Sequence, residues 1–165
     1  MNVKKTSRIR TLMPVPPFDK LPESDQVMAL LKSELLFVEK RINAHPKEQR
    51  WRRIFVRSLF AFIEGCAYRL RQDAMGFKEF PTKELQVLKE KEYRLNEKGE
   101  ISEGDMHIQT LANLRYSFNA YGRAFAINGA LDISDNRWDS LERAQKIRDR
   151  ITHPKDFDDL VITGR

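Results

Sequence analysis

The chain has 165 residues, of which 41% are hydrophobic and 33% charged, and its formal net charge is +6. This length fits one domain with a single sizeable core, and the excess of positive charge favours an acidic partner such as nucleic acid. The only cysteine, Cys66, excludes a disulfide framework or a zinc site built from several cysteines, and it fits a reducing compartment.

The first 21 residues mix basic side chains with Pro14, Pro16 and Pro17, which oppose a regular helix and predict an extended arm. This stretch lacks the apolar core of a secretory signal, and no run approaches the roughly 18 apolar residues of a membrane span. We therefore expect a cytoplasmic protein with no membrane partner. The domain itself is expected to occupy residues 22–160, with residues 161–165 as a tail.

Two long helices are predicted next. The first begins near Pro22 and ends near His45, because Pro46 disfavours helical geometry in the residue before it. The second starts at Pro46 and runs to about Asp73. Its middle is apolar on nearly all sides, which is typical of a central helix. One continuous apolar stripe is predicted along it: Phe55, Leu59, Phe62, Cys66 and Leu70.

Residues 75–103 give the weakest pattern. They predict a short helix capped by Thr82 and a turn in "NEKGEIS", with a β-hairpin as the less favoured alternative. A third long helix is expected over residues 105–127, and a last one from Ser134 or Asn136 through Ile151. The sequence thus predicts an all-α fold, an antiparallel bundle of four main helices with a short helical insertion.

The last predicted helix ends in "RDRITHP", which gathers Arg148, Asp149 and His153 at one end of the bundle. RNA cleavage without a metal needs a group that exchanges protons near neutral pH, and histidine is the side chain that does so. It also needs fixed positive charge on the developing phosphorane, which arginine supplies.

Ordinary helix termination is the alternative explanation of this motif. Basic residues are favourable near a helix C-terminus, and proline commonly follows the helix end. The segment "RINAHPKE" repeats the pattern with Arg41 and His45, so an arginine–histidine pair alone does not identify a site.

The segment "NRWDSLERAQKIRDRITHP" resembles the final helix of the HEPN superfamily, whose members carry arginine, a polar residue, a few further residues and histidine. The resemblance covers most of residues 22–160, and its specific motif spans six residues. It implies a helical bundle and a symmetric homodimer in which two motifs form one ribonuclease site for single-stranded RNA. Arg148 would then hold the scissile phosphate, His153 would be the acid–base group and Asp149 would orient one of them.

Many HEPN members act in toxin–antitoxin, antiviral or abortive-infection systems, and the resemblance therefore also implies an antitoxin or another partner protein. Other members only bind nucleotides or RNA, so a catalytically inactive module that binds RNA, nucleotide or a partner is the alternative. A third hypothesis is a purely structural bundle, in which Arg148 and His153 have no catalytic role. Some toxin members have a tyrosine two positions after the histidine, where this chain has Lys155, which argues against that branch.

Glu64 is the only acid in "RSLFAFIEGCAYR", within the most apolar helix. A carboxylate in such surroundings needs a cationic partner. It either forms a structural ion pair, with Arg57, Arg69 or another helix, or it positions Arg148 from across the bundle. The sequence leaves both open.

The segment "KEQRWRRIFVR" places several cations and one indole near a helix start. Such a cluster can hold an RNA backbone and stack a base, although a solvated basic helix end is equally consistent with it. The spacing of the three histidines marks no metal site, and we expect neither a metal nor another cofactor. The predicted RNA-binding residues are Arg50, Trp51, Arg53, Arg57, Arg150 and Lys155.

Overall fold

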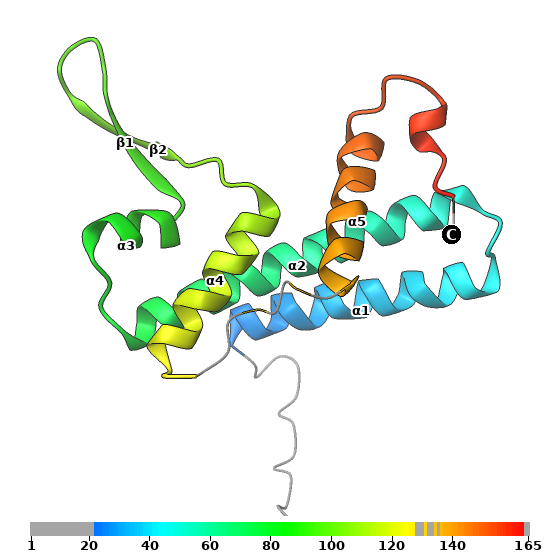
Figure 1. Cartoon of the computed structure of the whole chain (residues 1–165), viewed down its shortest axis with the longest axis horizontal. Coiled ribbons are helices and arrows are strands. Elements are labelled where there is room, and N and C mark those ends of the chain that lie inside the picture. The colour runs from blue at the N-terminus through cyan, green and yellow to red at the C-terminus, as the bar shows by residue number, and fades with distance from the viewer. Residues whose placement is uncertain (1–21, 128–130, 132–133, 135, 164–165) are drawn as a thin grey trace, which may run out of the picture.

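The computed structural model describes residues 22–127, 131, 134 and 136–163, and the predicted arm of residues 1–21 lies outside this range. Its frame is a pair of long helices that lie side by side and antiparallel, α1 (Glu23–Ala44) and α2 (Gln49–Phe77) (Figure 1). Acidic residues at Glu23 and Asp25 stabilise the first turn of α1, and Pro46 follows its end. Both helices were predicted from the sequence and are confirmed.

Helix α2 is the central helix, as predicted, and two core clusters form along it. Near its start, Val56 and Phe60 pack with Ile151 of α5 (Asn136–Thr152), and nearer its end Ala74 packs with Ala120 of α4 (Thr110–Ala124). The fully buried residues of α2 differ from the predicted stripe, because the side that meets α4 and α5 is the most deeply covered. They are Val56, Phe60, Ala67, Arg71 and Ala74.

The predominance of helix is confirmed, but the four main helices do not all run antiparallel. Thr110, at the start of α4, contacts Glu64, and Ala120 further along packs with Ala74. Helix α4 therefore follows α2 in the same direction. Helices α4 and α5 lie toward opposite ends of α2 (Figure 1).

The short helix predicted after α2 is confirmed, but the all-α prediction was wrong for the residues that follow it. The short helix α3 (Thr82–Leu88) is followed by an antiparallel hairpin of β1 (Lys91–Leu95) and β2 (Ile101–Asp105). The side chain of Asn96 accepts hydrogen bonds from the backbone N–H groups of Lys98 and Glu100, and Gly99 has a φ of +76°, so the loop reverses the chain. Thr82 is the first residue of α3 and makes no side-chain cap, contrary to the prediction.

The base of the hairpin is fixed by a buried arginine. Arg71 on α2 is 3% exposed, and its guanidinium contacts the Glu90 carboxylate at 2.9 Å and donates to the Asn113 side-chain oxygen on α4. Burial lowers the pKa of Arg71, and the nearby Glu90 charge opposes that shift. The backbone carbonyl of Glu90 accepts a bond of 2.7 Å from Met106, so the network joins α2 and α4 to both ends of the hairpin.

After α5 the chain folds back along the first turns of α2 through a short 3₁₀ turn, η2 (Asp158–Leu160). Ile162 packs into the core beside Val56 and Phe60, although the sequence placed residue 162 in a tail outside the domain. Its backbone N–H donates to Gln49 at 2.8 Å, and its carbonyl accepts from Arg52 at 2.8 Å. No helix in the described part of the chain has the length and apolar character required to cross a membrane.

Candidate functional site

A shallow pocket of about 250 Å³ lies between the middle of α2 and the last turns of α5. Its position follows from the packing of Ile151 on Phe60, which brings the C-terminal end of α5 onto α2. The lining combines two guanidinium groups, one carboxylate, one hydroxyl and an apolar floor. These residues are Arg57, Phe60, Ala61, Glu64, Arg148 and Thr152.

Arg148 is held in this pocket from two sides. One terminal nitrogen, Nη2, lies 3.0 Å from the Glu64 carboxylate, and the other, Nη1, lies 3.2 Å from Asp149. The guanidinium carbon lies 5.7 Å from the ring centroid of Phe60, within reach of a cation–π contact. Arg148 is only half-buried, so these contacts orient its guanidinium while leaving it accessible to an anion.

The structure brings Glu64 to Arg148 and not to the two nearer arginines of its own helix. Arg57 donates to the Ile151 carbonyl, and Arg69 pairs with Asp25 and Asp73. The sequence predicts Glu64 among apolar neighbours, but its side chain is 46% exposed, because it lines an open pocket. Its Oε1 also accepts a bond of 3.1 Å from Thr110.

His153 follows the last residue of α5. Its backbone N–H donates to the Asp149 carbonyl at 3.0 Å, which continues the helical path by one residue. Thr152, immediately before it, donates its hydroxyl to the Arg148 carbonyl at 2.6 Å. His153 and Asp149 are both exposed, and Thr152 rather than His153 belongs to the pocket lining. The motif thus places its arginine in the pocket and its histidine on the surface beyond the helix end.

Three of the predicted RNA-binding arginines are used within the protein. Arg53 donates to the Leu160 carbonyl at 3.0 Å, Arg57 to the Ile151 carbonyl at 2.9 Å and Arg150 to the Val161 carbonyl at 2.8 Å. Part-buried backbone carbonyls need donors, and these side chains supply them. Their first role is therefore structural, although Arg57 also lines the pocket.

The other three predicted RNA-binding residues are Arg50, Trp51 and Lys155. Arg50 is exposed and pairs with Glu48 at 2.9 Å. The ring of Trp51 already has the guanidinium carbons of Arg41 and Arg50 at 5.9 and 5.0 Å from its centroid, so a stacking base would have to displace one of them. Lys155 is exposed, and its backbone N–H donates to Asp159.

Phe60 and Thr110 belong to this site and were not predicted from the sequence. Phe60 precedes Glu64 by one helical turn, so it shares a face of α2 with that carboxylate, and this spacing was an available signal. No sequence signal pointed to Thr110, because its contact with Glu64 depends on how α4 crosses α2.

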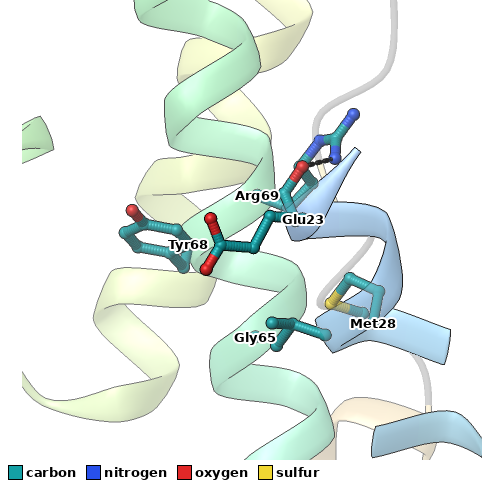
Figure 2. A pocket seen from close by; sticks show the side chains of 7 residues that line it. Glu23, Met28, Gly65, Tyr68 and Arg69 are labelled. Atoms are coloured by element: carbon teal, nitrogen blue, oxygen red, sulfur yellow. Dashed lines mark hydrogen bonds between the residues drawn. The ribbon is translucent and has the colours of Figure 1, made fainter. Parts of the chain in front are cut away.

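A second pocket of about 320 Å³ lies where the first turn of α1 meets α2 (Figure 2). Figure 2 shows the side chains of Glu23, Met28 and Tyr68 around it, with Gly65 on α2. Its cation, Arg69, is occupied by contacts to Ser24, Asp25 and Asp73. Arg69 is thus paired with two carboxylates, as Arg148 is, and the pocket at Arg148 differs in that a second arginine, Arg57, lines it.

Comparisons with protein-family models, with curated proteins and with solved structures found no match to this chain.

Proposed function

We propose that this protein is a metal-independent endoribonuclease of HEPN type, which acts in the cytoplasm in defence or in toxin-type growth control. The observation that supports this most directly is the ion pair of Glu64 and Arg148 in an open pocket at the end of α5. An arginine fixed by a carboxylate and still accessible suits an anionic substrate. The resemblance of the segment from Arg148 to His153 to the HEPN motif supplies the reaction type.

In the proposed reaction the His153 imidazole accepts the proton of the ribose 2′-hydroxyl. The 2′-oxygen then attacks the adjacent phosphorus and displaces the 5′-oxygen, which leaves with a proton from a general acid. The products are a 2′,3′-cyclic phosphate and a 5′-hydroxyl. Arg148 stabilises the negative charge that develops on the phosphoryl oxygens, and this role needs its guanidinium in a fixed orientation.

Glu64 and Asp149 are proposed as positioning residues, since each contacts a terminal nitrogen of Arg148. Arg57 adds a second guanidinium to the pocket, where it can contact the phosphate chain of single-stranded RNA. Its bond to the Ile151 carbonyl also fixes the end of α5 that carries His153.

The reaction also favours a homodimer. In an in-line displacement the attacking and leaving oxygens lie on opposite sides of phosphorus, so one imidazole does not reach both. A two-fold axis near α5 would bring His153 of a second copy to the leaving oxygen. An antitoxin or another partner protein that covers this surface would then control the activity.

The test is cleavage of single-stranded RNA by the purified protein in excess EDTA, with product ends analysed for the cyclic phosphate. We expect His153→Ala and Arg148→Ala each to remove most of the activity while the fold is retained. His45→Ala is the matched control, because His45 also stands between a helix end and a proline, and it should leave cleavage intact. Equal activity in wild type and His153→Ala would contradict the proposal. RNA binding without cleavage would favour the inactive module.

A further inference from the structure

The hairpin projects away from the helices (Figure 1), and one edge of its sheet is β1. The sheet in the described residues contains only β1 and β2. The order of the backbone bonds is fixed at both ends: Met106 donates to the Glu90 carbonyl at 2.7 Å, and Asn96 donates to the Glu100 carbonyl at 3.0 Å. Because bonded and non-bonded pairs alternate in an antiparallel ladder, Glu92 and Arg94 bond to β2.

It follows that the backbone N–H and C=O groups of the alternate residues, Lys91, Tyr93 and Leu95, point away from β2. Among the residues that the structure describes they have no backbone partner, so they form a row of donors and acceptors along the outer edge of β1, which is a template for another strand. Charged side chains on an edge strand ordinarily oppose such pairing. The order of the charges in "KEYRL", however, favours pairing with one particular partner strand.

That partner is a second copy of β1. When two copies run antiparallel with Tyr93 at the centre, Glu92 of each copy lies opposite Arg94 of the other. Lys91 lies opposite Leu95, where its aliphatic stem can cover the leucine. Tyr93 lies opposite Tyr93, and aromatic pairs of this kind stabilise sheets. In this register of two β1 strands, a glutamate therefore lies opposite an arginine at two positions.

The backbone and the side chains agree on this register. Tyr93 is one of the residues whose backbone points outward, so a central pair of Tyr93 residues exchanges two hydrogen bonds. Glu92 and Arg94 then form the non-hydrogen-bonded pairs, in which opposed side chains come closest. In the single copy Arg94 is already paired with Glu92 of its own strand, so the two pairs would form one cluster of four alternating charges.

The exposed apolar residues of the hairpin also favour this pairing. Tyr93, Leu95 and Ile101 share one face of the hairpin and are 52%, 73% and 76% exposed. A two-stranded hairpin is marginally stable alone, and a four-stranded sheet is more stable. The other edge does not offer this contact, because β2 paired with itself about Glu103 would place two carboxylates opposite each other.

We propose that β1 pairs antiparallel with β1 of a second copy, about a two-fold axis at Tyr93, to form a four-stranded sheet. The contact uses the same strand on both copies, so it closes after two chains and does not build open fibres. It involves neither α5 nor the pocket at Arg148, and it does not depend on the proposed ribonuclease function. A protein that also dimerised through α5 would form assemblies larger than a dimer.

The test exchanges the charges and measures association by sedimentation equilibrium at low ionic strength. Arg94→Glu turns both attractive pairs into repulsive ones and should weaken association by about 10-fold or more. The double variant Glu92→Arg with Arg94→Glu restores opposite charges and should recover the wild-type constant. Glu92→Arg mixed with Arg94→Glu should form mixed pairs. Lys98→Glu, in the exposed loop of the same hairpin, is the control and should have little effect.

Amide hydrogen exchange gives a second readout that any other interface would not reproduce. In assembled wild type the amides of Tyr93 and Leu95 should be protected, and in Arg94→Glu they should exchange rapidly. The amides of positions 92 and 94 should be protected in both, since they donate to β2. Association unchanged by Arg94→Glu, a double variant that does not recover, a wild type that stays monomeric, or rapid exchange at Tyr93 in the assembled protein would each overturn the proposal.

Discussion

Oε1 of Glu64 on α2 lies 3.0 Å from a terminal nitrogen of Arg148 on α5, and Thr110 at the start of α4 donates to the same oxygen at 3.1 Å. One carboxylate oxygen is thus shared by three helices. The contact lies where α4 begins and α5 ends on the central helix. Arg148 is oriented by this junction.

Glu64→Ala should lower RNA cleavage by up to about 100-fold, because a guanidinium that is no longer oriented is misplaced at the phosphate. Its effect on the free energy of unfolding should stay within about 1 kcal/mol, since both partners of the ion pair are substantially exposed. Glu64→Gln keeps an oxygen that can accept from Arg148 and should retain more activity. Thermal melts and single-turnover cleavage measure the two effects.

Glu48→Ala is the matched control for this prediction. Glu48 directly precedes α2 and pairs with the exposed Arg50, away from the pocket, so its loss should leave cleavage unchanged. A large fall in the melting temperature of Glu64→Ala would identify the carboxylate as structural, and full activity would remove its positioning role.

Ile162→Ala should destabilise the protein by about 2–3 kcal/mol, because Ile162 fills part of the core between α2 and α5 and its truncation leaves a cavity. Phe157→Ala, in the same returning segment, should change stability very little, since Phe157 is exposed. Urea denaturation of both variants makes the comparison. Equal effects would mean that residues beyond α5 do not belong to the core.

Cys66 should react slowly with iodoacetamide in the folded protein at pH 8 and rapidly in denaturant. Burial raises the pKa of its thiol, which keeps the unreactive protonated form at pH values where the unfolded thiol ionises. The stability gained by burying the neutral thiol is present below the unfolded pKa, about 8.5, and is lost as the pH rises toward the folded pKa. A folded-state rate equal to the denatured rate would show an accessible thiol.

The long helices were predictable because their signals are local: Pro22 marks the start of α1, and apolar spacing identified α2 as central. Two of the predicted starts were wrong, because α2 begins at Gln49 and not at Pro46, and α4 begins at Thr110 and not at residue 105, which ends β2. The hairpin was not predictable in this way, since "KEYRL" and "ISEGD" are short and mostly polar. Arg71 stabilises it from α2 through Glu90, and such a contact leaves no pattern in the segment itself.

Part of the candidate site was likewise predictable from the sequence, and part was not. A lone acid in an apolar helix needs a cation, and this argument led to Arg148 as one possible partner of Glu64. The basic cluster at the start of α2 was predicted to bind RNA, and its sequence did not reveal the partners that its arginines have within the protein. Arg50 pairs with the neighbouring Glu48, whereas Arg57 donates to a carbonyl at the end of α5. Arg53 meets a carbonyl 107 residues away, at Leu160, and composition alone does not distinguish such an arginine from one that awaits RNA.

Gly65 and Gly76 lie in the same helix and should respond in opposite ways to alanine. Alanine stabilises a helix interior by about 0.5–1 kcal/mol relative to glycine. A Cβ at Gly76 meets nothing within 4 Å, and because Gly76 lies in the last turn of α2, Gly76→Ala should gain up to this amount. A Cβ at Gly65 would lie 2.8 Å from Cδ1 of Leu31 and 3.2 Å from Sδ of Met28, so these two side chains of α1 have to shift there.

Overpacking of this kind costs about 1–3 kcal/mol, which should exceed the helix gain and leave Gly65→Ala less stable than wild type. Gly65→Val should lose more, because the two Cγ methyl groups of valine also enter the contact between α1 and α2. Leu31→Ala in the Gly65→Ala background removes the nearest obstructing atom and should recover part of the helix gain. Urea denaturation with a constant m-value measures all four variants. Equal stabilisation by alanine at both glycines would show that α1 does not approach α2 closely at Gly65.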